Sequence, residues 1–252
     1  MNGKDRLGII RQMITNEKKL QVSDLSKKFS VTEETIRRDF EKLEAEGVLN
    51  RTYGGAVLNT KNALSGVHFI KRAGHNVEKK KEIAIKVLKL LEDKHTLYAD
   101  SSTTVMQTLK LLKDRSDMTI VTNSSEAFHE LLLADVTIIS TGGIFNKKSL
   151  SFQGELTEKA TQNYNVDVAL VSCKALNKHK GACDSNEIEA RIKKIMINQA
   201  EEVIFLIDSS KFDLISFVHL SDFDKINYIV TDEKPSDEWI DILESAGVQL
   251  IY

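Results

Sequence analysis

The sequence predicts two domains of different fold class, a small N-terminal unit of helices with a β-hairpin and a larger, mostly parallel α/β unit. Three observations support this prediction. Two helices separated by a very tight turn are expected before residue 48, a hairpin with a glycine turn follows them, and from residue 81 onward β-branched runs alternate with helical stretches. Such alternation indicates a parallel sheet covered by helices on both faces. With 252 residues the chain is long enough for both domains.

The composition is that of an ordinary globular protein, with 41% hydrophobic and 29% charged residues and a net charge of −2. The first 58 residues are slightly basic, with 11 Lys and Arg against 9 Asp and Glu, which alone does not indicate a nucleic-acid partner. The chain has no run of 18 apolar residues and no apolar stretch at its N-terminus. We therefore expect a cytoplasmic protein with no membrane span and no secretory signal.

Metal and cofactor sites are not expected. Cys173 and Cys183 match neither a zinc site nor a disulfide framework, and buried thiols in a reducing compartment explain them. The six histidines form no close pair with the spacing of metal ligands.

The N-terminal unit begins with helical spacing of apolar residues over 5–16, followed by a strand fragment at 20–22. Ser23 is a suitable N-cap for a short helix that ends near Phe29. A tight turn then leads into a helix expected over residues 31–47.

This second helix is amphipathic. Ile36, Phe40 and Leu43 recur at i, i+4 and i+7, so they share a face that must be buried. Thr32 is a good N-cap, and Gly47 is placed to end the helix because glycine tolerates the left-handed conformation.

The face of this helix that points away from the apolar stripe is polar and largely basic, and it carries Thr35, Arg37, Arg38 and Lys42. Glu34 lies in the first turn, where the helix dipole favours anions. Arginine binds the major-groove edge of guanine through two hydrogen bonds and also clamps phosphate. Because paired arginines are common on helices, an ordinary solvated surface is the alternative interpretation.

A hairpin follows, with strands expected at 48–52 and 56–58 and a glycine turn at 53–55. Two helices joined by a short turn and followed by a hairpin form the plan of a winged helix-turn-helix. Arg51 lies beside the turn, where it is placed to contact phosphate or the minor groove.

The Thr-Ile-Arg-Arg-Asp-Phe core, the Leu-Glu-x-x-Gly exit and the Arg-Thr-Tyr-Gly-Gly-Ala wing resemble the DNA-binding signature of the DeoR family of bacterial transcription regulators. That family usually has Leu where this chain has Phe40. The resemblance implies binding to double-stranded operator DNA, and a winged helix used for protein contacts is the alternative. The candidate DNA-binding residues are Thr32, Glu34, Thr35, Arg37, Arg38, Lys42, Arg51, Tyr53, Gly54 and Gly55.

A polar stretch of small residues at 59–66 marks a domain boundary. We expect a DNA-binding domain at 1–58, a linker at 59–80 and an effector-binding domain at 81–252. The spacing of Phe69, Arg72, Asn76 and Lys80 resembles the segment that precedes the effector domain of DeoR regulators, and a plain solvated connector is the alternative.

The α/β domain is expected to alternate short strands with helices. Strands are expected at 96–99, 119–122, 136–140, 166–172, 203–207, 226–230 and 249–251, and helices at 82–91, 102–112, 126–133, 155–163, 187–200 and 237–246. In such sheets, ligands bind at the carboxyl ends of the strands.

Polar loops follow five of the expected strands, at 100–104, 122–124, 141–143, 173–174 and 208–211. Hydroxyls and free backbone N–H groups at the start of a helix suit a phosphate, and glycines permit close approach of a ligand. Lys174 and Lys211 supply positive charge. Each loop alone is explained by an ordinary N-cap and each lysine by an ordinary surface position, but five such loops at one edge predict a binding site.

This domain also resembles the sugar-phosphate sensor domain of DeoR regulators, through Asp-Ser-Ser-Thr-Thr, Val-Thr-Asn, Thr-Gly-Gly, Gly-x-x-x-Ser-Asn-Glu and Asp-Ser-Ser-Lys-Phe. The resemblance implies a fold related to ribose-5-phosphate isomerase and a phosphorylated sugar as effector. The family commonly has Gly where this chain has Ser102, and often a glycine near Cys173. The candidate effector-binding residues are Asp100, Ser101, Ser102, Thr103, Thr104, Thr122, Asn123, Ser124, Gly142, Gly143, Lys174, Glu187 and Lys211.

These patterns predict a transcription regulator, a repressor of a carbohydrate operon that a phosphorylated sugar releases from its operator. A homodimer or higher homo-oligomer is expected, because such regulators read two half-sites. One alternative is a sugar-phosphate isomerase with an appended DNA-binding domain. Residues 172–176 lack the paired carboxylates that those isomerases carry in a similar loop, so no catalytic residue is assigned. Another alternative is a constitutive DNA binder with a degenerate sensor.

Overall fold

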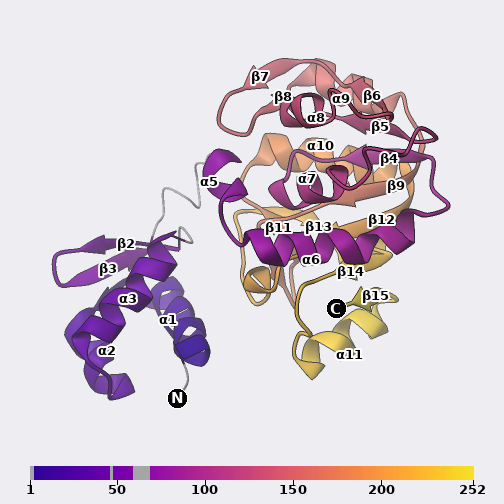
Figure 1. Ribbon diagram of the computed structural model, residues 1–252. Coiled ribbons are helices and arrows are strands. Elements are labelled where there is room, and N and C mark those ends of the chain that lie inside the picture. Colours follow the sequence, from indigo (N-terminus) through magenta and orange to yellow (C-terminus); the bar gives the residue numbers. More distant parts are fainter. Residues whose placement is uncertain (1–2, 46–47, 59–68) are drawn as a thin grey trace. The chain divides into compact units, whose positions relative to one another are not determined.

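The computed structural model describes residues 3–45, 48–58 and 69–252 (Figure 1). The chain divides into two compact units, Met1–Val67 and His68–Tyr252, which are described separately. Gly47, which was expected to end a helix, and the expected linker stretch 59–66 lie outside the described residues.

The first unit is a three-helix arrangement with a small antiparallel sheet, whose strands lie in the order β1-β3-β2. Its elements are α1 (Gly3–Glu17), β1 (Lys19–Gln21), α2 (Val22–Phe29), α3 (Glu33–Ala45), β2 (Leu49–Thr52) and β3 (Gly55–Leu58). The predicted stripe of Ile36, Phe40 and Leu43 is fully buried against Ile10 and Leu25. Burial of this stripe orients α3 and confirms the predicted winged helix-turn-helix.

The turn between α2 and α3 is tight because Ser30 adopts the left-handed conformation, with φ 53°. Thr32 caps α3 as predicted, since its Oγ1 accepts a hydrogen bond from the Thr35 N–H at 3.3 Å. The expected cap at Ser23 is wrong. Helix α2 starts directly after β1 ends at Gln21, so Ser23 already lies inside the helix.

A buried ion pair joins α1 to α3. The Arg6 guanidinium donates to both carboxylate oxygens of Asp39, at 2.5 and 3.2 Å. Both side chains are nearly inaccessible. Asp39 therefore belongs to the support of α3, although its neighbours Arg37 and Arg38 are exposed.

The second unit is built on a seven-stranded parallel sheet in the order β15-β14-β12-β9-β4-β5-β6. The strands are β4 (Thr96–Ala99), β5 (Thr119–Thr122), β6 (Thr137–Ser140), β9 (Val166–Val171), β12 (Ala200–Leu206), β14 (Tyr228–Val230) and β15 (Gln249–Ile251). All seven were predicted, and the central strands such as β9 stand out because strands buried on both faces read as short apolar runs.

Helices cover both faces of this sheet (Figure 1). Their bounds are α5 (Phe69–Ala73), α6 (Val77–Val87), α7 (Thr103–Leu109), α8 (Ser125–Glu130), α9 (Glu155–Gln162), α10 (Glu187–Asn198) and α11 (Asp237–Ser245), with 3₁₀ turns η1 (Leu88–Leu91), η2 (Ser209–Lys211) and η3 (Phe223–Lys225). Successive residues of β9 point to opposite faces. Leu170 packs in the cluster that includes α6 and α7, whereas Val171 packs in the cluster that includes α10 and α11.

Two small antiparallel sheets were not predicted. One is the pair β7 (Ile144–Asn146) and β8 (Ser151–Gln153), and the other has the order β10-β11-β13, with β10 (Ala175–Asn177), β11 (Gly181–Asp184) and β13 (Val218–Ser221). Within each sheet the strands are antiparallel, so the alternation of strand and helix that marks the parallel sheet does not reveal them.

The segment expected to be a linker up to residue 80 is partly helical. Helices α5 and α6 begin at Phe69 and Val77, and Phe69 is buried in the core of the second unit. Because Phe69 is anchored in this core, the residues of α5 that follow it belong to the α/β unit and not to a linker.

The order of strands creates a switch point between β4 and β9. From β4 the chain moves outward to β5 and β6, then returns to place β9 on the other side of β4. The connections after β4 and β9 therefore diverge, and a crevice is expected outside the carboxyl ends of these two strands. Asp100 follows β4 and Ser172 follows β9 at this point.

Candidate DNA-binding and effector sites

The exposed face of α3 carries the predicted arginines. The Arg37 guanidinium pairs with Glu33 at 2.7 Å and that of Arg38 pairs with Glu34 at 3.5 Å, all four side chains being exposed. Exposed pairs of this kind contribute only about 0.3–0.5 kcal/mol, so a phosphate or a guanine edge can replace the glutamates. Lys42 is also exposed.

The wing is tied to α3 through Arg51. Its side chain pairs with Glu44 and with Glu41, both at 2.7 Å, and its backbone N–H donates to Glu44 at 2.8 Å. The side-chain hydrogen bond to Glu44 is the main reason that the pKa of Arg51 is raised. A phosphate that binds Arg51 must therefore compete with two carboxylates.

The turn of the wing presents Tyr53, whose side chain is fully exposed. Gly54 has φ 83°, in the left-handed region that favours glycine. A Cβ on Gly55 would lie 2.3 Å from the Leu20 carbonyl oxygen, so the close approach of β1 and β3 requires glycine there. Both glycines thus have a structural role that is independent of DNA.

In the second unit, Asp100 joins the two loops of the switch point. One carboxylate oxygen accepts from the Ser102 N–H at 2.8 Å, and the other accepts from the Ser172 N–H at 3.0 Å. Lys193 lies 3.3 Å from Asp100 and 2.6 Å from Asp184. The predicted binding residue Asp100 is therefore engaged in holding the site together.

Several predicted loop residues also have internal partners. The Ser102 and Ser124 hydroxyls accept from backbone N–H groups and cap α7 and α8. The Thr122 hydroxyl donates to the Ala99 carbonyl at 2.7 Å. The remaining loop residues that are buried at the strand ends are Ser101, Thr103, Thr104 and Asn123.

Gly142 and Gly143 have φ 60° and 113°. A Cβ on Gly143 would lie 2.1 Å from the Thr157 hydroxyl, so helix packing explains this glycine. Glu187 is exposed and pairs with Arg191 at 3.2 Å, so the structure does not bring it among the buried strand-end residues.

A group of cations gathers beside the carboxyl ends of β9 and β12. It comprises Arg72, Lys80, Lys174 and Lys211. Burial, Lys211 and Arg72 all lower the pKa of Lys174. Among the described residues, Lys174 has no carboxylate partner within ion-pair distance, and Lys211 is placed 3.4 Å from Asp208. Asp184 and Asp208 act in the opposite direction on Lys174, but burial is the largest cause and the pKa of Lys174 is lowered overall.

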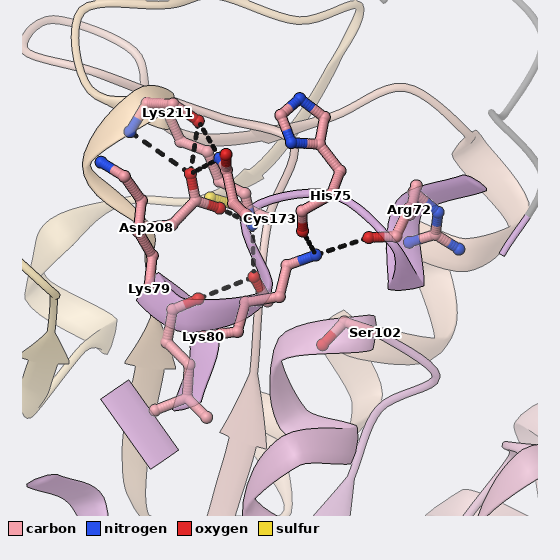
Figure 2. A network of polar contacts seen from close by, with 12 residues as sticks. Arg72, His75, Lys79, Lys80, Ser102, Cys173, Asp208 and Lys211 are labelled. Atoms are coloured by element: carbon pink, nitrogen blue, oxygen red, sulfur yellow. Dashed lines mark hydrogen bonds and ion pairs between the residues drawn. The ribbon is translucent and has the colours of Figure 1, made fainter. Parts of the chain in front are cut away.

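Lys80 is the most buried of these cations, with 5% of its surface exposed. Figure 2 shows its ammonium directed at the carbonyl oxygens of Arg72 and His75, each at 2.5 Å. Burial lowers the pKa of Lys80 to about 8, with Lys211 and Arg72 acting in the same direction and Asp208 opposing them. An anion bound here would restore the favourable charge balance of the group.

Asp208 is the acid within this group. Burial alone would raise its pKa, but Lys211, the Ser210 hydroxyl, Lys80 and Asn76 lower the pKa of Asp208 to about 2. Asn76 donates to it at 3.1 Å and has the left-handed φ of 51°. The network fixes the corner between α5 and α6 against the loop after β12 (Figure 2).

Sequence reasoning missed the contribution of the α5–α6 corner to this site. Arg72, Asn76 and Lys80 were expected in a linker, and the structure places them with Lys174 and Lys211. Their spacing resembled a family segment, which was the one signal that pointed to them. Asp184, Glu189 and Lys193 were also missed, since nothing in their spacing indicates a shared site.

Affinity for an anion at this group is expected to fall as pH rises through about 8, because the Lys80 ammonium then loses its proton and its attraction for a phosphate. Above pH 8 the fall should continue, well away from the phosphate pKa of about 6. Calorimetric titrations with a phosphate-bearing ligand between pH 7 and 9.5 measure this. Lys80→Met should bind more weakly with a shallower slope, and an unchanged slope in that variant would contradict the assignment.

The Lys80 ammonium also affects the free energy of unfolding, but this effect increases with pH whereas the affinity for an anion decreases. Unfolded Lys80 keeps its proton up to its ordinary pKa of 10.5, whereas the folded protein releases it near 8. Between these values the unfolded state binds more protons, so this group adds stability as pH rises.

A winged helix and an α/β unit with a group of cations at its strand ends, in one chain, define a DNA-binding regulator that carries a ligand sensor. The chain belongs to the DeoR family. A DeoR-like helix-turn-helix domain matches residues 6–62, and a DeoR C terminal sensor domain matches residues 75–233.

Relatives align over nearly the whole chain. The HTH-type transcriptional regulator YulB of Bacillus subtilis strain 168 is 39% identical over 96% of this chain and 93% of its own length. The L-fucose operon activator of Haemophilus influenzae is 36% identical over 94% of each chain. The HTH-type transcriptional repressor GlcR of Bacillus subtilis is 30% identical over 100% of this chain and 96% of its own length.

These relatives are transcriptional regulators, so the chain is a regulator and not an isomerase. Among solved structures, ribose 5-phosphate isomerase from Methanocaldococcus jannaschii has a TM-score of 0.41 and 17% identity, over 54% of this chain and 55% of that chain. Within the described part of the chain, no helix is both long and apolar enough to cross a membrane.

Proposed function

We propose that this regulator is a repressor of a carbohydrate operon and that a phosphorylated sugar releases it from operator DNA. The observation that supports this most is the excess of buried and half-buried cations around Lys80 and Lys174. Buried charge without a counter-charge is unfavourable, and a phosphate dianion supplies two negative charges at once. Hydrogen bonds between ammonium groups and phosphate oxygens are of the strong, charge-assisted kind.

The α5–α6 corner is the part of the sensor unit through which we propose that ligand binding affects DNA binding. Besides the contacts of Asn76 and Lys80, the Lys79 ammonium donates to Ser209 at 2.6 Å and pairs with Asp232 at 3.0 Å. The corner follows the segment that leads from the winged helix in sequence. An effector that binds its cations acts directly on the corner, and it shifts the DNA-bound state only if it binds the two states unequally.

We further propose a homodimer or higher homo-oligomer as the DNA-binding form. A single α3 reads one short stretch of major groove, and two copies related by symmetry read two half-sites. Within each copy, Thr32, Thr35 and Lys42 would flank the arginines on DNA, and Glu34 would orient Arg38.

The effector half of the proposal is tested by Lys211→Met. The variant should lose about 10-fold or more in affinity for the sugar phosphate, because it removes a charge-assisted contact, and operator binding should be unchanged. Calorimetry with a panel of sugar phosphates and their dephosphorylated forms is the measurement. Lys225→Met is the matched control, because Lys225 is an exposed lysine at the end of the 3₁₀ turn η3.

Equal affinity of the unmodified protein for a sugar and its phosphate ester would show that phosphate is not recognised. A Lys211→Met variant that still dissociates from DNA at the same inducer concentration would remove Lys211 from the effector site. Thermal unfolding of each variant establishes that it is folded.

A further inference from the structure

A second group of polar side chains lies where β5 ends and β8 runs beside it. Asn123 is 3% exposed, and its Nδ2 donates to the Phe152 carbonyl at 3.1 Å. The Phe152 N–H in turn donates to the Asn123 carbonyl at 2.7 Å. The Asn123 Oδ1 is buried and has no hydrogen-bond partner among the described residues. A buried acceptor in this state is costly unless a ligand donates to it.

Gln153 and Glu189 continue this group. Ser151 and Gln153 share one side of β8, and the Gln153 Nε2 donates to Ser149 at 3.3 Å and approaches Glu189 Oε1 at 3.5 Å. The Gln153 Oε1 is already occupied, because it accepts from Asn146 at 3.1 Å. Gln153 is therefore oriented with its amide donors toward Glu189.

Glu189 is half-buried in the first turn of α10. Burial raises the pKa of Glu189, and Asp184 acts in the same direction, while Lys193 and Arg72 oppose them. Burial is the largest cause of this shift, and a hydrogen bond with Ser149 also opposes it. A hydrogen-bond donor from a ligand would stabilise the carboxylate.

Arg72 connects this group to the cations. Its guanidinium lowers the pKa of Glu189 and also the pKa values of Lys80 and Lys174, so its charge acts on both groups. The Asn123 Oδ1 and the Glu189 carboxylate are hydrogen-bond acceptors, whereas the four cations of the other group are donors. A ligand that meets both groups needs an anion at one end and hydrogen-bond donors at the other.

We propose that Asn123 and Glu189 bind hydroxyl groups of the effector, that Gln153 positions Glu189, and that these residues determine which phosphorylated sugar is recognised. The inference rests on the proposed function, and it assigns the residues that bind the end of the ligand opposite the phosphate. The ligand class is a sugar phosphate with free hydroxyls beyond its phosphorylated carbon. Sugar hydroxyls donate to a carboxylate or an amide oxygen, which a phosphate dianion does not do.

The test separates the two ends of the ligand. Inorganic phosphate probes the cation group alone, and a panel of pentose and hexose phosphates probes both groups, each measured by calorimetry on the full chain. Glu189→Gln should lower the affinity for the preferred sugar phosphate ~10-fold or more and leave that for inorganic phosphate within about twofold. Asn123→Ala should act in the same direction. Glu155→Gln is the control, because Glu155 is an exposed glutamate in the first turn of α9.

Equal losses for inorganic phosphate and sugar phosphate in Glu189→Gln would overturn the inference, because Glu189 would then act through the fold or the phosphate group. No loss for either would also overturn it. An unmodified protein that binds every sugar phosphate no better than inorganic phosphate would refute the hydroxyl contacts and leave the phosphate site standing. Binding of neither would refute the proposed function itself.

Discussion

Simultaneous replacement of Arg37 and Arg38 by alanine is expected to abolish specific operator binding while the protein stays folded. Both side chains lie on the exposed face of α3, and their partners Glu33 and Glu34 hold them only through exposed pairs. Each arginine that makes a bidentate contact with guanine contributes about 1–3 kcal/mol, so each loss is about 5-fold to 150-fold. Thermal stability should change little, since surface pairs are weak.

The operator for this measurement can be selected from a pool of random duplexes with the unmodified protein. Affinity is then determined at several salt concentrations. Loss of a guanine contact reduces discrimination between sequences, whereas loss of a phosphate contact weakens all duplexes alike and lowers the salt slope by about 1. Arg191→Ala is the matched control, because Arg191 is exposed and pairs with a glutamate four residues earlier on α10. A folded double variant with undiminished operator affinity would falsify the assignment of α3.

The folding of the first unit could be predicted because its determinants are local. The spacing of Ile36, Phe40 and Leu43 fixes the buried face of α3, and Thr32 fixes its start. The cap at Ser23 was wrong because its determinant is not local. The strand pairing that ends at Gln21 is set by β3, which lies far along the chain. Local capping preference yields when tertiary structure sets the element boundary.

The parallel sheet was predictable for a related reason. Val168 and Leu170 face one core cluster while Ala169 and Val171 face the other, so four successive residues of β9 are apolar and stand out in sequence. Strand β10 did not stand out in this way, although two of its three residues are buried, and the small antiparallel sheet that it forms was missed.

The site was only partly predictable. Strand ends give the location, because parallel strands share one edge, and the cation Lys211 follows β12 as expected. Asp100, a candidate effector-binding residue, also has a structural role, since its carboxylate accepts from two backbone N–H groups and lies 3.3 Å from Lys193. Arg72 and Lys80 reach the site through tertiary packing of α5 and α6, which no local pattern specifies. The DNA and effector contacts of the individual residues remain predictions.

Replacement of Lys193 by methionine is expected to destabilise the second unit by about 3–5 kcal/mol, because it leaves two buried carboxylates without their counter-charge. Lys193 pairs with Asp184 at 2.6 Å and with Asp100 at 3.3 Å, and it donates to the Ser172 carbonyl at 2.8 Å. Burial acts to lower the pKa of Lys193, but the two aspartates raise it overall, so the ammonium stays charged at neutral pH.

For a unit of this size the loss corresponds to a fall in Tm of about 6–20 °C. Scanning calorimetry measures it, with Lys194→Met as the control because Lys194 is the exposed neighbour on the same helix. Adding Asp184→Asn to Lys193→Met should recover part of the loss, since it removes one of the unpaired charges. Equal Tm values for the two single lysine variants would show that the ion pair does not hold the site. Because Asp100 joins the loops of β4 and β9, a destabilised Lys193→Met variant should also bind effector more weakly, which connects the stability of this buried network to the sensing function.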